Sequence, residues 1–416
     1  MENSYDVLIV GAGHAGAHTA LALRQQGFTG SLALIGDEPE LPYERPPLSK
    51  EFLAGDKPFD RLLIRPASFW SERAVQVLTG RRVVAVDPAT RTVRTARGET
   101  FAYGRLVWAT GGRARPLTCP GADAAGVLAL RTRADAEAIQ RAVTGVQRVA
   151  IVGGGYNGLE VAAALVAKDK EITVIEACDR VLARVAGEVL SRFYEAEHRA
   201  RGVDVRLGAK VCAIETRDGR ATGVRLDDGT VLPAEMVVVG IGIIPAVEPL
   251  IEAGAASADG VEIDAFARTC LPDVLAVGDC ALHANSFADG ARIRLESVQN
   301  AVDMAATAAR TLTGDPRPYH AVPWFWSNQF DLKLQTVGLS IGHDQTVVRG
   351  DIATRSFSVV YLRRGRVIAL DCVNAARDFA QGRALVADGA QIDPAVLADA
   401  SVPLKQAAVQ APAAPG

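Results

Sequence analysis

The chain has 416 residues, of which 22% are charged, and its formal net charge at neutral pH is −3. This length accommodates two or three domains, each with its own hydrophobic core. The charge pattern shows no basic stripe of the kind that binds nucleic acid, and no apolar run reaches the roughly 18 residues of a membrane helix. The first strand is expected almost at the N-terminus, which leaves no space for a signal peptide. We therefore expect a soluble cytoplasmic protein.

The first predicted element is a buried strand over residues 7–10 (VLIV), followed at once by the glycine pattern GAGHAG at 11–16. In such a pattern the first glycine makes a tight turn, the second lets a pyrophosphate approach, and the third lets a helix pack on the strand. The N–H groups of that helix then face the anion. A second strand over 31–36 ends at Asp37, whose carboxylate can accept both hydroxyls of an adenosine ribose.

The same arrangement recurs further along the chain. A strand over 149–152 (VAIV) leads into GGGYNG at 153–158, and a following β-branched strand ends at Glu176. A carboxylate at that position repels a 2′-phosphate, so this unit favours NADH over NADPH, although Arg180 and Arg184 could weaken the preference. Two complete units predict that the protein holds two dinucleotides at once.

Both units continue into similar sets of short β-branched strands, over residues 82–95 and 211–226. The Asp-Gly dipeptides at 218–219 and 228–229 are typical of tight hairpin turns. One plan repeated in tandem indicates two similar domains rather than a single domain with a chance motif.

The remaining chain predicts a return to the first domain and then a third domain. A buried parallel strand is expected at 274–279 and a helix at about 297–312, whereas antiparallel strands are expected from about residue 323. The predicted fold class is α/β, with two Rossmann-like domains and a C-terminal α+β domain. The expected ranges are 1–113 and 247–322 for the first domain, 114–246 for the second, 323–405 for the third, and 406–416 for a disordered Ala/Pro-rich tail.

The six cysteines are scattered, with no CxxC pair and no spacing typical of a zinc site. None lies close to the first glycine pattern, where a disulfide-reducing flavoenzyme needs a cysteine pair. We therefore expect no thiol–disulfide chemistry and no metal site, and electrons must leave by another route.

Several short motifs identify a resemblance that covers almost the whole chain. They are PPLSK (46–50), ATGG (109–112), GGGY (153–156), VGDC (277–280), ESV (296–298), PWFWSNQ (323–329) and VPLK (402–405). Together they resemble the NADH-dependent, FAD-containing ferredoxin reductases that serve bacterial cytochromes P450 and ring-hydroxylating dioxygenases. Two positions depart from the family, because Asn157 replaces the usual Ile and Ala246 replaces an Asn that many members carry.

The resemblance implies a glutathione-reductase-like fold, non-covalent FAD, NADH as electron donor and a [2Fe–2S] ferredoxin as acceptor. It also implies a monomer or weak dimer. The implied mechanism is hydride transfer from NADH to FAD, followed by release of single electrons to ferredoxin. No general acid or nucleophile is needed, because the cofactor supplies the chemistry.

The resemblance assigns the first glycine pattern and the loops around it to FAD. Arg45 would neutralise pyrophosphate charge, Asp279 would accept a ribityl hydroxyl, and the backbone at Val298 would face the flavin N1–C2=O edge. The residues expected to contact FAD are Gly11, Gly13, Ala15, Gly16, Asp37, Glu38, Arg45, Pro46, Lys50, Val83, Ala109, Thr110, Gly111, Arg131, Gly278, Asp279, Glu296, Ser297, Val298 and Trp326.

The second glycine pattern is assigned to NAD in the same way. The expected contacts are Gly153, Gly155, Tyr156, Asn157, Gly158, Glu160, Glu176, Arg184, Gly240, Ile241 and Gly242. Lys50 and Glu160, the latter in the first turn of the helix, are expected to form an ion pair at the border of the nicotinamide pocket. Trp326 is expected between the isoalloxazine and the docked ferredoxin. Lys50, Glu160 and Trp326 are thus the residues expected to take part in catalysis.

Ferredoxins are usually acidic, so a local basic patch is expected despite the negative net charge, with Arg65, Arg73 and Lys405 as candidates. Three alternatives stay open, the first of which, a plain NADH oxidase, lacks the catalytic cysteine of that group. The acceptor could be rubredoxin or a small radical such as monodehydroascorbate, or the protein could be a redox-signalling flavoprotein that responds to NADH.

Overall fold

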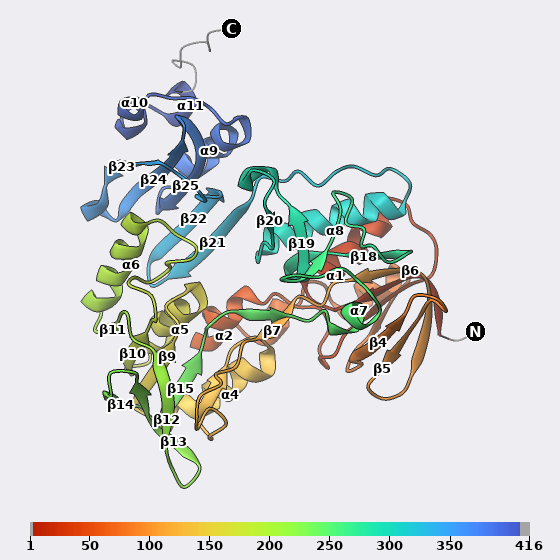
Figure 1. Ribbon diagram of the computed structural model, residues 1–416, viewed down its shortest axis with the longest axis horizontal. Coiled ribbons are helices and arrows are strands. Elements are labelled where there is room, and N and C mark those ends of the chain that lie inside the picture. Colours follow the sequence, from red (N-terminus) through yellow and green to blue (C-terminus); the bar gives the residue numbers. More distant parts are fainter. Residues whose placement is uncertain (1–2, 408–416) are drawn as a thin grey trace. The chain divides into compact units, whose positions relative to one another are not determined.

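The computed structural model describes residues 3–407. The chain divides into two compact units, and Figure 1 labels many of their elements. Unit 1 contains the chain up to Arg45 together with Phe59–Arg113 and Ile244–Trp324, and unit 2 contains Pro46–Pro58, Ala114–Ile243 and the chain from Phe325 onward. In the described part, no helix combines the length and the apolar character needed to cross a membrane.

Unit 1 is built on a mostly parallel sheet that carries the first glycine pattern. The sheet order is β3-β2-β1-β6-β5-β4, and β18 pairs with β6 on the same sheet. The strands are β1 (Ser4–Val10), β2 (Leu32–Ile35), β3 (Val75–Leu78), β4 (Val83–Asp87), β5 (Thr92–Thr95), β6 (Thr100–Trp108) and β18 (Val274–Ala276). The expected strand near residue 274 is therefore present, and its pairing with β6 is parallel.

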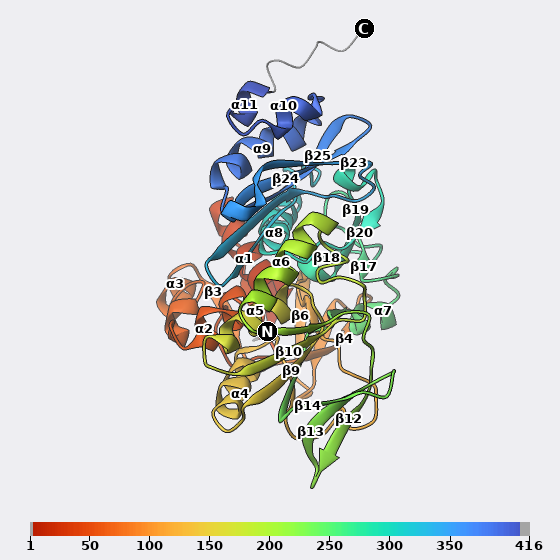
Figure 2. The same ribbon diagram turned by 90° about the vertical axis from the view of Figure 1, so that its left-hand side faces the viewer.

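Helices cover this sheet. Helices α1 (His14–Gln25) and α8 (Val298–Leu312) pack against each other and lie side by side in Figures 1 and 2. The small face of α8, with buried Ala301, Ala305 and Ala308, permits this close packing. The other elements of unit 1 are η2 (Phe59–Leu62), α3 (Ala67–Glu72), α7 (Glu248–Glu252), β17 (Val261–Glu262), η3 (Gly278–Cys280), β19 (Ala281–Ala284), η4 (Ser286–Ala288) and β20 (Arg292–Ile293).

Unit 2 contains a second parallel sheet, in the order β11-β10-β9-β15-β8, which carries the second glycine pattern. Its strands and helices are β8 (Val127–Ala129), α4 (Arg133–Val143), β9 (Arg148–Val152), α5 (Tyr156–Val166), β10 (Glu171–Ile175), α6 (Glu188–Ala200), β11 (Asp204–Arg206) and β15 (Met236–Val239). An antiparallel sheet of β12 (Val211–Arg217), β13 (Arg220–Leu226) and β14 (Val231–Pro233) follows β11 along the chain. Asp218 and Gly219 turn between β12 and β13 with φ values of 52° and 75°, as expected for a tight hairpin.

The C-terminal part of unit 2 is an antiparallel sheet in the order β21-β22-β25-β24-β23, with α9 packed on it. Its elements are β21 (Trp324–Gln329), β22 (Leu332–Gly338), β23 (Gln345–Asp351), η5 (Ile352–Thr354), β24 (Ser356–Arg363), β25 (Arg366–Val373), α9 (Ala376–Asp388), α10 (Pro394–Ala398) and α11 (Leu404–Ala407). Helix α11 includes Gln406 and Ala407, which the sequence analysis assigned to a disordered tail. The rest of that predicted tail, 408–416, lies outside the described residues.

One hydrophobic core joins the two halves of unit 2. Leu190 and Phe193 of α6 belong to the same buried cluster as Phe357 and Tyr361 of β24. The segment Pro46–Pro58, which forms η1 (Pro46–Ser49) and α2 (Glu51–Ala54), also belongs to unit 2, and its Leu53 enters this core. The sequence analysis placed that segment in the first domain. The division into three domains stays a prediction.

Two short strands, β7 (Gly112–Ala114) and β16 (Ile243–Pro245), pair with each other where the chain changes unit. The sequence analysis places a domain boundary between residues 113 and 114, and this boundary stays a prediction.

Candidate functional site

The first and third glycines of both patterns are required by the fold itself. Gly11 and Gly153 have φ values of 112° and 109°, and a Cβ atom there would lie 2.3 Å from a backbone oxygen. At Gly16 and Gly158, a Cβ atom would lie 1.8 Å and 2.0 Å from the carbonyl oxygen of the first glycine. No side chain fits such spaces, so these positions say little about a ligand.

The second glycines of the two patterns are not required by the fold in this way. Gly13 has φ −86° and ψ −163°, and Gly155 has φ −78° and ψ 179°, which any residue can adopt. A Cβ atom at Gly155 would meet nothing within 4 Å, and at Gly13 it would meet only the Arg45 Nε, at 3.9 Å. A bound pyrophosphate would account for glycine at these two positions, because it approaches the backbone where a side chain would stand.

The helix ends beside these glycines suit an anion. Neither α1 nor α5 has a side chain that caps its N-terminus, and neither has an acidic residue in its first turn. The positive end of each helix dipole is therefore not neutralised by its own side chains. The residues present fit two dinucleotides, one in each unit.

In unit 1 the acid after β2 is Asp37, and hydrogen bonds hold the loop that follows it. Asp37 is exposed, while Glu38 accepts hydrogen bonds of 2.5 Å from both the Tyr43 hydroxyl and the Arg45 guanidinium. Arg45 also lies over the Tyr43 ring, with its Cζ 5.2 Å from the ring centroid. Arg45 is thus held close to Gly13, and its contact with the pyrophosphate of FAD stays a prediction.

The other FAD candidates of unit 1 gather at strand and helix ends. Thr110, just after β6, donates a 2.7 Å hydrogen bond to the Ala246 carbonyl, and Asp279 lies in η3 after β18. Ser297 caps α8 by accepting from the Asn300 N–H, which makes Val298 the first helical residue. Glu296 lies outside the helix and pairs with Arg294 at 2.9 Å. Ala15 is buried in α1 and Val83 is buried in β4.

Four predicted FAD contacts belong to unit 2 instead. Pro46 begins η1, Lys50 follows that turn, Arg131 lies between β8 and α4, and Trp326 lies in β21. The sequence analysis treated them as one set with the residues of unit 1. They remain predicted contacts.

In unit 2 the acid after β10 is firmly oriented. The Glu176 Oε2 accepts from the Gly154 N–H at 2.7 Å, and Oε1 accepts from the Cys178 N–H at 2.8 Å. Each carboxylate oxygen has a second lone pair, so both can still accept a ribose hydroxyl. The loop after β15, from Gly240 to Gly242, lies beside the first glycine of the pattern, because a Cβ atom at Gly153 would touch the Gly240 oxygen.

The two arginines near Glu176 differ in their exposure and in their hydrogen bonds. Arg180 is half-buried and donates to the carbonyls of Ala183 and Ala186 and to the Ser191 hydroxyl. Arg184 is exposed, and its guanidinium lies 3.7 Å from where a Cβ of Gly242 would stand. Of these two arginines, only Arg184 has an exposed guanidinium beside this loop, and its contact with NAD stays a prediction.

Tyr156 and Asn157 open helix α5. The Tyr156 ring packs on Phe325, with 4.7 Å between ring centroids, and Asn157 is exposed. The Trp326 ring lies 6.4 Å from the same Phe325 ring and is half-buried in β21.

Lys50 and Glu160 lie together, with 2.6 Å between Nζ and Oε2. The side chains are 11% and 2% exposed, so this is a buried ion pair. Glu160 is in the second turn of α5, which has no acid in its first turn, so the expected position in the first turn is wrong. The error is small because residues four apart lie on the same face of a helix.

Further polar residues of this site were missed by the sequence analysis. Ser49 donates to Glu160 Oε2 and Ser327 donates to Oε1, both at 2.6 Å. Gln329 and His198 extend the network behind Ser327. Ser49 and Ser327 stand inside the quoted motifs at 46–50 and 323–329, which was the available signal.

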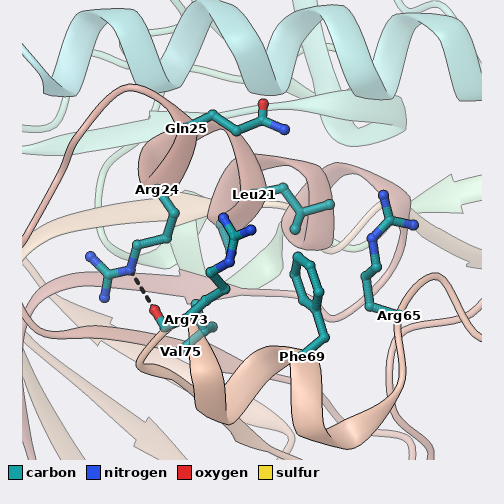
Figure 3. A pocket seen from close by; sticks show the side chains of 8 residues that line it. Leu21, Arg24, Gln25, Arg65, Phe69, Arg73 and Val75 are labelled. Atoms are coloured by element: carbon teal, nitrogen blue, oxygen red, sulfur yellow. Dashed lines mark hydrogen bonds between the residues drawn. The ribbon is translucent and has the colours of Figure 1, made fainter.

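Two of the three candidates for the basic patch come together in unit 1. The Arg65 and Arg73 guanidiniums lie over the Phe69 ring, 5.4 Å and 5.1 Å from its centroid. These side chains line a pocket of about 200 Å³, and Figure 3 shows them together with Leu21 and Arg24. The third candidate, Lys405, belongs to α11 of unit 2.

Comparisons with known proteins agree with this geometry. Residues 5–305 match the family Pyridine nucleotide-disulphide oxidoreductase, and residues 324–408 match the family Reductase C-terminal. The chain is 58% identical, over 97% of its length and 98% of the relative's, to the 5,5'-dehydrodivanillate O-demethylase ferredoxin reductase subunit of Sphingobium sp. (strain NBRC 103272 / SYK-6). It is 41% identical to putidaredoxin reductase CamA of Pseudomonas putida, over 98% of the chain and 97% of that protein.

Solved structures give the same result. The ferredoxin reductase for the CYP199A2 system of Rhodopseudomonas palustris matches with a TM-score of 0.94 and 42% identity, covering 98% of this chain and all of that one. The reductase in a covalent putidaredoxin reductase–putidaredoxin complex also matches with a TM-score of 0.94, at 39% identity and 99% coverage of both chains. The resemblance stated from the sequence is confirmed, as are the fold class and the cofactors FAD and NAD(P)H. The chain therefore belongs to the ferredoxin reductases of the pyridine nucleotide-disulphide oxidoreductase family.

Proposed function

We propose that this ferredoxin reductase takes its electrons from NADH and passes them singly to a [2Fe–2S] ferredoxin that supplies a cytochrome P450 or a ring-hydroxylating dioxygenase. The observation that carries the proposal is the pair of second glycines, Gly13 and Gly155, whose open faces lie at uncapped helix N-termini, where a bound pyrophosphate accounts for them. Six free cysteines fit a reducing compartment, so we place the protein in the cytoplasm.

FAD, when bound, accepts two electrons as hydride and releases them one at a time. The residues of unit 1 that would hold it are Gly13 and Arg45 at the pyrophosphate, Asp37 at the adenosine ribose, and Asp279 and Val298 toward the flavin. Val298 contributes its backbone N–H at the positive end of α8, which stabilises negative charge. Asp279 contributes a carboxylate at the end of a parallel strand, where sheets of this type bind ligands.

Glu176 gives the preference for NADH. Its carboxylate is fixed by two backbone N–H groups, so it cannot turn away from a 2′-phosphate, and the repulsion weakens NADPH binding. Arg184 acts in the opposite direction, because its exposed guanidinium attracts phosphate. We expect a clear but incomplete preference for NADH.

The Lys50–Glu160 pair orients the nicotinamide. A buried carboxylate with bound donors is a fixed acceptor for the carboxamide N–H₂, and the neighbouring Lys50 ammonium, 2.6 Å away, helps to hold it in place. Neither group exchanges a proton with the substrate in this scheme, because hydride transfer needs only position and electrostatics.

The Arg65–Phe69–Arg73 cluster is the proposed contact for ferredoxin. Two guanidiniums on one aromatic ring, with no acidic side chain lining the adjoining pocket, present positive charge that suits an acidic partner. Trp326 remains the proposed residue between flavin and ferredoxin.

The test is stopped-flow reduction of the purified holoenzyme by NADH and by NADPH, followed by mixing with a [2Fe–2S] ferredoxin. Fast bleaching by NADH and rapid ferredoxin reduction are expected. Fast bleaching without transfer to ferredoxins, but with transfer to rubredoxin or monodehydroascorbate, would replace the proposed acceptor. Slow bleaching into a persistent long-wavelength complex would favour the signalling flavoprotein instead.

A further inference from the structure

The Glu160 carboxylate is surrounded by hydrogen-bond donors from separate segments of unit 2. Lys50 and Ser49, from the segment Pro46–Pro58, both donate to Oε2, and Ser327 of β21 donates to Oε1. All three bonds are 2.6 Å long, and Ser327 is fully buried. A buried carboxylate needs donors on both oxygens, and β21 provides the one donor recorded on Oε1 among the described residues.

The donor on Oε1 is itself held by a chain of hydrogen bonds. The Gln329 Nε2 donates to the Ser327 oxygen at 3.2 Å, and the Gln329 Oε1 lies 2.8 Å from the Nε2 of His198 on α6. An amide oxygen can only accept, so His198 donates through Nε2. Burial lowers the pKa of His198 to about 4, so its ring is neutral near pH 7 and carries that single N–H.

The hydrogen bonds in this series, from His198 to Glu160, all point the same way. The imidazole donates to the amide, the amide to the hydroxyl, and the hydroxyl to the carboxylate. Because bonds aligned in this manner polarise one another, the Ser327 hydroxyl is a stronger donor than an isolated one, and it has a single orientation. This series of hydrogen bonds ends at the negative charge of Glu160.

We propose that Ser327 is a positioning residue for the hydride-transfer step: it fixes the rotation of the Glu160 carboxylate, and Gln329 and His198 fix the Ser327 hydroxyl. The C-terminal part of the chain thereby sets the geometry of a pair formed by Lys50 and Glu160. This inference rests on the proposed role of Glu160 at the nicotinamide.

Removing the hydroxyl frees one carboxylate oxygen. In Ser327→Ala, Oε1 loses its donor, and the group can rotate so that both oxygens face Lys50 and Ser49. The carboxamide would then meet a carboxylate in the wrong orientation. We expect NADH to reduce the flavin about tenfold more slowly, in line with the loss of a hydrogen bond to a charged group.

The experiment compares Ser327→Ala with a matched control, Ser358→Ala. Ser358 is also fully buried in the same sheet, and its hydroxyl also donates to a carboxylate, that of Asp378, at 3.0 Å. Reduction by NADH is measured by stopped flow, NAD⁺ binding to the oxidised holoenzyme by calorimetry, and the Glu160 side-chain orientation by crystallography of each variant. Ser327→Cys, which keeps the volume but is a weak donor, serves if the alanine variant folds poorly.

The expected result is about tenfold slower reduction in Ser327→Ala and Ser327→Cys, a rotated Glu160 carboxylate, and NAD⁺ affinity within about threefold of the parent. Ser358→Ala should reduce at the parent rate. The inference is overturned if Glu160 keeps its orientation in both Ser327 variants, or if Ser358→Ala slows reduction equally. Glu160→Gln distinguishes the positioning inference from the proposed role of Glu160. If NADH reduces this variant slowly while the Ser327 variants are reduced at the parent rate, only the positioning inference fails. If NADH also reduces Glu160→Gln at the parent rate, the proposed role of Glu160 fails.

Discussion

The two nucleotide sites share one sequence plan and hold their acids differently. In unit 1, Asp37 is exposed, and the braced acid is its neighbour Glu38, held by Tyr43 and Arg45. In unit 2, Glu176 is itself held by two backbone N–H groups. A cofactor that stays bound can gather affinity from many contacts, whereas a substrate that exchanges at every turnover gains from a carboxylate that is already oriented. The spacing of the motif therefore does not determine how firmly its acid is fixed.

The largest expected effect concerns the glycines that the two sites have in common. Gly16→Ala and Gly158→Ala each place a Cβ within about 2 Å of a backbone oxygen, so the strand and helix must separate. We expect each to lower the free energy of unfolding by more than about 4 kcal/mol, measured by denaturant titration of the holoenzyme. Similar losses in both units would show that the shared plan is structural. A variant with parental stability would mean that the helix can shift freely.

The next effect is the pH dependence of stability that one buried histidine contributes in each unit. His198 of unit 2 and His283 of unit 1 are buried, and burial lowers the pKa of each from 6.5 to about 4. A lowered pKa means that the neutral form is favoured in the native state, so this stability is present above pH 6.5 and is lost as the pH falls toward 4. For His198 the loss is roughly 3 kcal/mol.

His198→Gln should remove the part of the acid sensitivity that belongs to His198, and leave the part that belongs to His283. The free energy of unfolding is measured between pH 4 and 7 for the parent and the variant. An unchanged slope in the variant would contradict the assignment to His198.

A third prediction tests the ligand role of the second glycines. Gly155→Ala fits the backbone and the space, so the fold should stay intact while NAD⁺ affinity falls by about a hundredfold, because the methyl group occupies the place of a phosphate. Gly13→Ala should weaken FAD retention in the same way.

Gly145→Ala is the matched control, since a Cβ there also meets nothing within 4 Å. Calorimetry measures both affinities. If Gly155→Ala bound NAD⁺ like the control, the second glycine pattern would not hold the pyrophosphate.

The smallest effect concerns the choice between NADH and NADPH. Glu176→Ala should lower the ratio of kcat/KM for NADH over NADPH by about tenfold, because it removes both a ribose acceptor and a repulsive charge. Arg184→Ala should raise the same ratio about threefold. Arg180, which is bound to its own loop, should not shift the ratio when it is replaced with Lys.

The sequence predicted the elements that repeat and missed the contacts that join distant segments. Strands β1 and β9, the glycine turns and helices α1 and α5 follow from local spacing, and each occurs where expected. The bond from Ser327 to Glu160 spans 167 positions, and no local pattern specifies it. The membership of Pro46–Pro58 in unit 2 was missed for the same reason, because Leu53 packs into a core formed by later residues.

The free cysteines also make the second site easy to observe. The Cys178 backbone holds Glu176, and its side chain is exposed, so a fluorophore attached to this thiol would stand two positions from the acid that meets the ribose. Its pKa is raised, chiefly by a hydrogen bond with Glu176, so labelling calls for mildly alkaline buffer. With exposed Cys212 and Cys270 and half-buried Cys119 replaced by serine, a fluorophore on Cys178 would report coenzyme exchange at the second site.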